Sequence, residues 1–461
     1  MSDLIEKDLL AIDHRYIWHP FTQSKHWVED APAPIIERGV GVTLFDTAGR
    51  AYLDGVSSLW CNVHGHSVPE LLAALHTQVD KLCHSTMLGL THRPIIELTK
   101  ELVKILPPGL TKIFYADDGS TAVEAGLRMA LEWWQKKGDA AAKKRTKLLS
   151  LGDAYHGDTL GAVGVGFLKT FHEHCESAVI PALRITPPHA RRIIEGLPLT
   201  DAEQASLEEL KNVLSKHGEE IAAFVVEPLV QGAAGIWIHS AGFLQAAAAM
   251  CKQRGILIIA DEVATGFGKT GSMFATVKAG IEPDILIVGK GLSGGYLPIS
   301  AAIAREEIFA GFIGPVEEHK TFYYGQTFAG NPLAAAVAKA NIELFESSNL
   351  LTALQPKIAH FQKELTNNIL PLDAVFEIRQ EGVMVGIELT AKPGSLTPFA
   401  TKDRIPAQIV REARERGAII RPLGNVIVLM PPLAISAEQI SSLVSITKEA
   451  IIAGINWAGI N

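Results

Sequence analysis

The sequence predicts an α/β fold: a large domain with a mostly parallel central sheet flanked by helices, and a smaller α+β domain. Two apolar runs rich in β-branched residues, 255–262 and 284–291, are typical of strands buried on both faces. Between about 110 and 305, such runs alternate with helical stretches, as in α/β domains. The pattern then changes to mixed strands and helices, so we expect domains at 57–345 and 346–461.

Length and composition exclude several classes of protein. The chain has 461 residues, of which 48% are hydrophobic and 20% charged, as is ordinary for a globular protein. A net charge of −8 argues against nucleic-acid binding. The four cysteines are widely spaced without a CxxC pair, so no disulfide framework or zinc ribbon is expected. Without a signal-peptide core or a membrane-length apolar run, we expect a cytoplasmic protein with no membrane partner.

The first 105 residues predict a short helix, small strands and two longer helices. Residues 35–46 alternate loosely around glycines, as a hairpin would, and 53–66 predict a loop. The loop contains His64 and His66, but no third metal ligand lies close by, so a structural role is favoured. Residues 67–70 form a capping box that begins a helix. We expect the second helix at 86–105.

A strand at 112–115 leads into a helix that begins near Gly119 and ends at Gly138. The junction contains Gly119 and Ser120. Backbone N–H groups at such a helix start, together with the helix dipole, favour an anion such as phosphate. An ordinary N-cap without a ligand is the alternative.

The remaining elements follow from the same patterns. Tyr155 follows a strand at 148–151, where an aromatic ring either stacks on a cofactor or simply packs. Glu227 ends a strand at 222–226. The other expected segments are a proline-bearing connection at 186–200, helices at 202–216, 241–254, 333–347, 351–367, 406–416 and from 436, and strands at 299–304, 377–379, 384–389, 418–421 and 426–430.

Asp261 and Lys290 end the two apolar runs. In an open α/β sheet, ligands bind at the carboxyl ends of the strands, so both side chains should project from the same edge. Pyridoxal phosphate (PLP) needs a lysine amine for a covalent Schiff base and a carboxylate that keeps its ring nitrogen protonated. The alternative is a buried ion pair or two solvated strand ends.

Residues 266–271 contain Gly-Lys-Thr, the end of a nucleotide-binding P-loop. That motif requires an earlier glycine at the position of Val263, and it must open a helix. A P-loop-type nucleotide-binding protein therefore stands only as an alternative from a different class.

Taken together, several motifs resemble the class III aminotransferases of PLP fold type I. The resemblance rests on Asp261–Gly268 followed by Lys290, on Tyr155–Gly157, on Glu227-Pro228, and on Thr327 before Gly330-Asn331-Pro332, and it covers nearly the whole chain. It implies that residues 1–56 belong to the small domain.

The resemblance also implies roles for individual residues. Lys290, Asp261 and Tyr155 would be catalytic, with Lys290 holding PLP covalently. The implied cofactor-binding residues are Gly119, Ser120, Tyr155, Glu227, Asp261, Lys290, Gln326 and Thr327, and the implied substrate-binding residues are Phe21, Leu59, Trp60, Tyr155, Gly325 and Arg421. Gln326 and Thr327 would reach in from a second subunit, which implies a homodimer with active sites at its interface. No metal ion is expected in the site.

Four shorter stretches, 18–23, 57–60, 62–66 and 421–424, are similar to one branch of that family. The branch transfers an amino group from S-adenosylmethionine or lysine to the keto acid 8-amino-7-oxononanoate in biotin biosynthesis. Four positions depart from the best-known pattern of the branch, namely Phe21, Leu59, Lys269 and Val428. Another ω-aminotransferase, acting on ornithine, 4-aminobutyrate or a diamine, is the alternative within the family.

Overall fold

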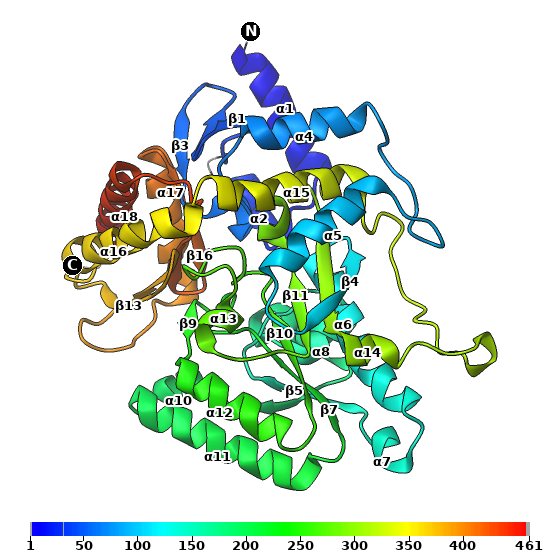
Figure 1. Cartoon of the computed structure of the whole chain (residues 1–461). Helices are drawn as coiled ribbons and strands as arrows, with labels where there is room; N and C mark the ends of the chain where they lie inside the picture. Colours follow the sequence, from blue (N-terminus) through cyan, green and yellow to red (C-terminus); the bar gives the residue numbers. More distant parts are fainter. Residues whose placement is uncertain (1, 31, 458–461) are drawn as a thin grey trace.

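A seven-stranded sheet lies at the centre of the molecule (Figure 1). In the computed structural model, which describes residues 2–30 and 32–457, the strand order is β4-β12-β11-β10-β7-β5-β6. Only β12 runs antiparallel to its neighbours, so the predicted mostly parallel sheet is confirmed. The strands are β4 (Leu110–Ala116), β5 (Lys147–Leu151), β6 (Leu183–Ile185), β7 (Ile221–Val226), β10 (Leu257–Asp261), β11 (Ile285–Val288) and β12 (Ser300–Arg305).

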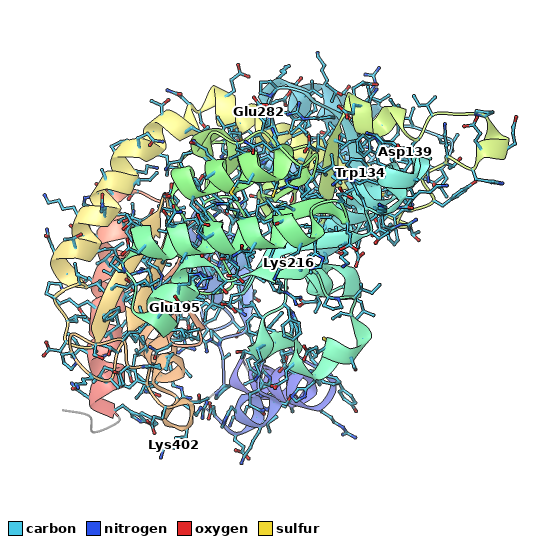
Figure 2. The ribbon with its side chains drawn as sticks, turned by 90° about the horizontal axis from the view of Figure 1, so that it is seen from below. Trp134, Asp139, Glu195, Lys216, Glu282 and Lys402 are labelled. Carbon is cyan, nitrogen blue, oxygen red and sulfur yellow. The ribbon has the colours of Figure 1, made fainter. Side chains whose placement is uncertain are left out.

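Helices cover both faces of this sheet, which explains why its central strands are apolar throughout. Ile259 and Ile287 pack toward α6 (Gly119–Lys136), whereas the alternate residues Ile258 and Leu286 pack on the opposite face. That face is covered by α5 (Arg93–Ile105), α11 (Leu199–His217), α12 (Ala241–Lys252) and α15 (Pro332–Ser347). Seen from below, α11 and α12 lie side by side across the large domain (Figure 2).

A smaller α+β unit contains the carboxyl-terminal part of the chain. Its four-stranded sheet has the order β13-β14-β17-β16, and three helices pack in the same unit. The strands are β13 (Val375–Glu381), β14 (Met384–Leu389), β16 (Arg421–Leu423) and β17 (Val426–Leu429), and the helices are α16 (Leu350–Asn368), α17 (Ile405–Glu415) and α18 (Ala437–Trp457).

The two ends of the chain meet in another sheet, of order β1-β2-β3-β15. Here β15 (Ala418–Ile419) pairs in parallel with β3 (Ala51–Asp54), while β1 (Ile36–Val40) and β2 (Thr43–Asp46) form the expected hairpin. The pairing agrees with a small domain made from both chain ends, although the exact boundaries 1–56, 57–345 and 346–461 stay predictions. The N-terminal helices are α1 (Ser2–Tyr16) and α2 (Ser24–Glu29).

The remaining elements are short. They are α3 (Ser57–Trp60), α4 (Pro69–Val79), α7 (Ala140–Lys143), α8 (Leu160–Val165), α9 (Lys169–His172), α10 (Pro188–Glu195), α13 (Ala275–Ala279), α14 (Glu306–Ala310), the strands β8 (Val230–Gln231) and β9 (Trp237–Ile238), and the 3-10 turns η1 (Glu173–Ala178), η2 (Lys290–Ser293), η3 (Val316–Glu318) and η4 (Thr401–Asp403). The segment between α14 and α15 projects away from the rest of the chain in both views (Figures 1 and 2).

Four local predictions were wrong. The loop expected at 53–66 includes the end of β3 and the short helix α3. The helix expected at 86–105 begins only at Arg93, because the His92 side chain accepts the N–H of Ile95 and ends the preceding loop. Ser67 does not cap α4, since its hydroxyl donates to Gly39 O and Val68 is the N-cap. The connection at 186–200 contains the helix α10.

Candidate active site

A cavity of about 550 Å³ lies at the carboxyl ends of β7, β10 and β11. Such a volume suits a small cofactor together with a substrate. Ten of the residues expected in the site line it, namely Phe21, Leu59, Trp60, Gly119, Ser120, Tyr155, Glu227, Asp261, Lys290 and Arg421. The structure therefore brings together side chains that lie up to 400 positions apart in the sequence (421 − 21).

Lys290 occupies the turn directly after β11, as expected. Its backbone is left-handed, with φ of +40°, a conformation that costs energy for a side-chain-bearing residue and occurs often at functional sites. Its Nζ lies 4.8 Å from the centre of the Trp60 ring. Burial lowers the pKa of Lys290, with Asp261 acting in the opposite direction. The lowered pKa increases the fraction of free amine, the form that attacks a carbonyl carbon.

Asp261 ends β10 and is only 5% exposed. Its Oδ2 accepts a hydrogen bond from His156 Nδ1 at 2.7 Å, and its Oδ1 accepts the N–H of Val263 at 3.0 Å. Although burial opposes a charged imidazole, the hydrogen bond and the charge of Asp261 raise the pKa of His156. The imidazole also holds the Asp261 carboxylate in place at the wall of the cavity.

Tyr155 and Glu227 lie beside this pair. Glu227 accepts the N–H of Tyr155 at 3.1 Å and that of Gly232 at 2.9 Å, which fixes the backbone from which the Tyr155 ring extends. Burial raises the pKa of Glu227 to about 7. Burial also raises the pKa of Tyr155, so its hydroxyl keeps the proton that it donates to Asp158.

The start of α6 has the features of an anion site. Asp118 caps the helix by accepting the N–H of Thr121 at 3.0 Å. The N–H groups of Gly119 and Ser120 lie in the first turn, where the helix itself offers no carbonyl acceptor. Both residues line the cavity. Gly157 approaches so closely that a Cβ there would lie 2.2 Å from Ser120 Oγ, and its φ of +116° also requires glycine.

The loop that carries Leu59 and Trp60 is held by a buried lysine. Lys269 Nζ donates to Ser57 Oγ at 2.8 Å and to Asn62 O at 2.9 Å, and burial lowers the pKa of Lys269 to about 7. Because Lys269 is only 1% exposed, it is unavailable to a bound nucleotide. Residues 266–271 also open no helix, so the P-loop alternative is wrong.

Arg421, in β16, supplies a cation to the cavity. Burial lowers its pKa, although nearby Tyr155 acts in the opposite direction. Among the described residues, no carboxylate lies within ion-pair distance of Arg421. A half-buried guanidinium without an acidic partner favours an anionic ligand, and its planar shape matches a carboxylate.

The structure adds residues that the sequence did not single out. Phe171 lines the cavity and packs edge-to-face on Phe21, with ring centres 5.3 Å apart. The sequence assigns His156 no role beyond its place in the Tyr155–Gly157 motif. Its position next to an aromatic residue at a strand end is the feature that could have indicated it. Asp158 accepts a hydrogen bond from the Tyr155 hydroxyl, and His172 in turn contacts the Asp158 carboxylate.

Gly325, Gln326 and Thr327 are not among the residues that line the cavity of their own chain. They belong to the projecting segment between α14 and α15 (Figure 1). The two histidines noted in the sequence have internal partners: His64 Nε2 pairs with Asn341 O, and His66 Nε2 with Asp54. Within residues 2–30 and 32–457, no cluster of three or more His, Cys, Asp or Glu could hold a metal ion, and no helix has the length and apolarity needed to cross a membrane.

Comparison with known proteins gives relatives over almost the full length. The family described as aminotransferase class-III matches residues 24–451. Adenosylmethionine-8-amino-7-oxononanoate aminotransferase of Geobacter sulfurreducens is 44% identical, covering 98% of this chain and 99% of that protein. The crystal structure of the protein of that name from Methanocaldococcus jannaschii is 40% identical, with a TM-score of 0.91 over 97% of this chain and 99% of the other.

A further solved structure shows a relative with its cofactor. The PLP-bound amine transaminase from an uncultivated Pseudomonas species is 30% identical, with a TM-score of 0.89 over 95% of this chain and 99% of that one. The residues of the cavity fit PLP, because they offer a lysine amine, a buried carboxylate and the free N–H groups of a helix start. The chain belongs to the class III aminotransferases and uses pyridoxal phosphate as its cofactor.

Proposed function

We propose that this protein transfers an amino group to 8-amino-7-oxononanoate and forms 7,8-diaminononanoate, a step of biotin biosynthesis. The observation that carries the proposal is near-full-length identity of 36–44% to relatives named for this substrate. The cavity supports it, because Arg421, which can hold the carboxylate of the keto acid, lines it together with the apolar side chains of Phe21, Leu59 and Trp60.

When bound, PLP supplies an aromatic ring that takes up electrons from the substrate carbon and carries the amino group between the two substrates. Lys290 Nζ would hold the cofactor covalently, and once the substrate amine has taken its place the freed Lys290 amine would remove the proton of the substrate carbon and return it. Asp261, oriented by His156, would hold the ring nitrogen in its protonated form. Tyr155 would stack on the ring, and its backbone position is set by Glu227.

Other residues bind the ends of the ligands. The N–H groups of Gly119 and Ser120 hold the phosphate. Arg421 binds the substrate carboxylate, and Phe21, Leu59 and Trp60 contact the methylene chain of the keto acid. Phe21 and Leu59 are 54% and 47% exposed in the single chain, so the bound substrate would cover apolar surface that otherwise contacts water.

A homodimer with its active sites at the interface completes this proposal. Gln326 and Thr327 would bind the phosphate of the neighbouring subunit, and Gly325 would line its substrate pocket. Support comes from the segment that carries them, which projects from the rest of the chain (Figure 1). On this segment the side chains of Tyr323 and Phe328 are 68% and 59% exposed. Apolar side chains gathered on a projecting segment are typical of protein interfaces.

The donor is proposed to be S-adenosylmethionine, with lysine as the alternative. The name shared by the relatives supports S-adenosylmethionine. Lysine is kept as the alternative because Phe21 and Leu59 depart from the best-known pattern of the branch. We also propose a cytoplasmic location, because all four cysteines are free, including the exposed Cys83, as suits a reducing compartment.

The test is product formation by purified, PLP-loaded protein. Supplied with 8-amino-7-oxononanoate and either S-adenosylmethionine or lysine, the protein should form 7,8-diaminononanoate, detectable by mass spectrometry. The productive donor identifies itself in this comparison. Turnover with ornithine, 4-aminobutyrate or a diamine, without turnover of 8-amino-7-oxononanoate, would contradict the proposal.

A further inference from the structure

A cluster of hydrogen bonds surrounds the hydroxyl of Tyr155. The hydroxyl donates to Asp158 Oδ2 at 2.6 Å, and Asp158 Oδ1 lies 3.3 Å from His172 Nε2. The backbone N–H of Asp158 also donates to Ser120 Oγ at 3.3 Å. Asp158 thus joins the proposed ring-stacking residue to the proposed phosphate-binding residue.

The surroundings of His172 determine which ring nitrogen carries its proton. His172 Nδ1 accepts the backbone N–H of Leu168 at 3.1 Å, so it presents a lone pair. Nε2 therefore carries a hydrogen in either charge state, and it points at the Asp158 carboxylate. The imidazole is a donor toward Asp158 because a neighbouring main-chain group fixes its tautomer.

Packing also holds the His172 ring in place, in addition to its hydrogen bonds to Leu168 and Asp158. The side chain is 4% exposed, and its ring lies nearly parallel to that of Tyr155, with an angle of 13° and centres 6.1 Å apart. Phe167 and Phe171 pack on it from the same segment. This buried donor holds the Asp158 side chain, which is 51% exposed, in the position where it accepts from the Tyr155 hydroxyl.

We propose that His172 is a positioning residue that acts through Asp158 to hold the Tyr155 ring in the cavity. The inference rests on the proposed function, because it assumes that Tyr155 contacts the cofactor. If the Asp158 carboxylate turned toward solvent, the Tyr155 hydroxyl would lose its acceptor and the ring would be free to rotate. The cofactor would then bind more weakly, and the substrate beside it would be held less well.

Two substitutions separate this role from a local structural one. His172→Gln places an amide N–H where Nε2 lies and keeps the donor to Asp158. His172→Asn places an acceptor where Nδ1 lies and keeps only the bond to the Leu168 N–H. Both variants lose the ring, and they differ from each other by one methylene group. His174→Asn, at an exposed histidine in η1, controls for substitution in this segment.

The readouts are PLP affinity, from fluorescence titration of the apoprotein, and KM for the amino acceptor. We expect His172→Asn to weaken PLP binding and raise KM by about tenfold each, the usual effect of losing a hydrogen bond to a charged group. His172→Gln should stay within about threefold of the wild type, less than the loss of one such bond. In the Asp158→Ala background, His172→Asn should change nothing further, because the effect passes through Asp158.

The reverse order, with Asn closer to the wild type than Gln, would show that His172 only stabilises its own turn. Equal effects of both substitutions would assign the role to the ring rather than to the donor, and either result overturns the proposal. If His172→Asn does not fold, Asp158→Ala alone must reproduce the loss of PLP affinity. Because PLP titration needs no substrate, it decides the role of His172 even if 8-amino-7-oxononanoate is not converted.

Discussion

His156 Nδ1 and Asp261 Oδ2 lie 2.7 Å apart, although the two residues are 105 positions apart in the chain. Both side chains are almost fully buried. One end of the carboxylate is therefore held by an imidazole, while the other receives a single backbone N–H. This arrangement fixes the direction in which Asp261 faces the cavity.

The first prediction concerns the donor that His156 provides. His156→Asn keeps an N–H near the position of Nδ1, whereas His156→Leu leaves the buried carboxylate without that donor. The Leu variant should bind PLP at least about tenfold more weakly, since a lost hydrogen bond to a charged group costs about 1.5–3 kcal/mol. The Asn variant should bind more tightly than the Leu variant. Fluorescence titration of apoprotein measures both, and equal affinities would show that Asp261 does not depend on His156.

The second prediction concerns Arg421. Arg421→Ala should raise KM for 8-amino-7-oxononanoate by an amount worth about 2–5 kcal/mol, because a buried anion would lose its partner. Arg421→Lys should lie between the Ala variant and the wild type, since it keeps the charge but not the two parallel hydrogen bonds. Steady-state kinetics measures the effect, with PLP affinity as the control. An unchanged KM would remove Arg421 from the carboxylate site.

The third prediction is a pH dependence of stability that originates at Lys269. In the unfolded chain a lysine keeps its proton to about pH 10.5, whereas burial lowers the pKa of folded Lys269 to about 7. Between these values the unfolded state binds more protons, so the free energy of unfolding should rise with pH, by at most about 1.4 kcal/mol per pH unit. Lys269→Met should make that rise smaller, while Lys290, whose pKa burial also lowers, still contributes to it.

Denaturant unfolding of apoprotein from pH 7 to pH 10 measures the Lys269 effect. Lys211→Met, at a lysine side chain that is 69% exposed, is the control and should follow the wild-type curve. If Lys269→Met and the wild type had parallel curves, the folded Lys269 amine would titrate like an exposed lysine.

The fourth prediction tests whether two chains share a site. Lys290→Ala and Thr327→Ala should each be nearly inactive alone. A heterodimer of the two contains one site with wild-type Lys290 and wild-type Thr327, so random mixing should restore about a quarter of the wild-type activity. Activity is measured after the two inactive proteins have been mixed and allowed to exchange subunits. No recovery, with exchange confirmed by tagged chains, would place Thr327 in the site of its own chain.

Much of the fold was predictable, because its signals are local. Apolar runs such as 284–288 match strands covered on both faces, and the glycines near 39–41 match a hairpin. Helix starts were less predictable. Ser67 has the residue type of a cap, but its hydroxyl is satisfied by Gly39 O in a neighbouring strand. The start of α5 depends on His92, which caps less commonly than serine or aspartate.

The site was predictable to the extent that its residues carry chemistry at strand ends. Asp261 and Lys290 follow this rule, and sheet geometry brings them together. Phe171 and His172 were not predicted as site residues, because an aromatic residue or a histidine on a short helix has no distinctive local pattern. Their contacts with Phe21 and Asp158 arise only when the chain folds back over the cavity.

The most direct test of the central claim is a half-reaction followed by the visible absorbance of the bound cofactor. PLP-loaded protein is mixed separately with 7,8-diaminononanoate, S-adenosylmethionine, lysine and ornithine, with Lys290→Ala as the control for covalent attachment. We predict that the visible absorbance band of the bound cofactor is lost with 7,8-diaminononanoate and with either S-adenosylmethionine or lysine. Loss of the band with ornithine alone would contradict the proposed substrate. A protein that shows no such band after PLP is added would contradict the roles of Asp261 and Lys290.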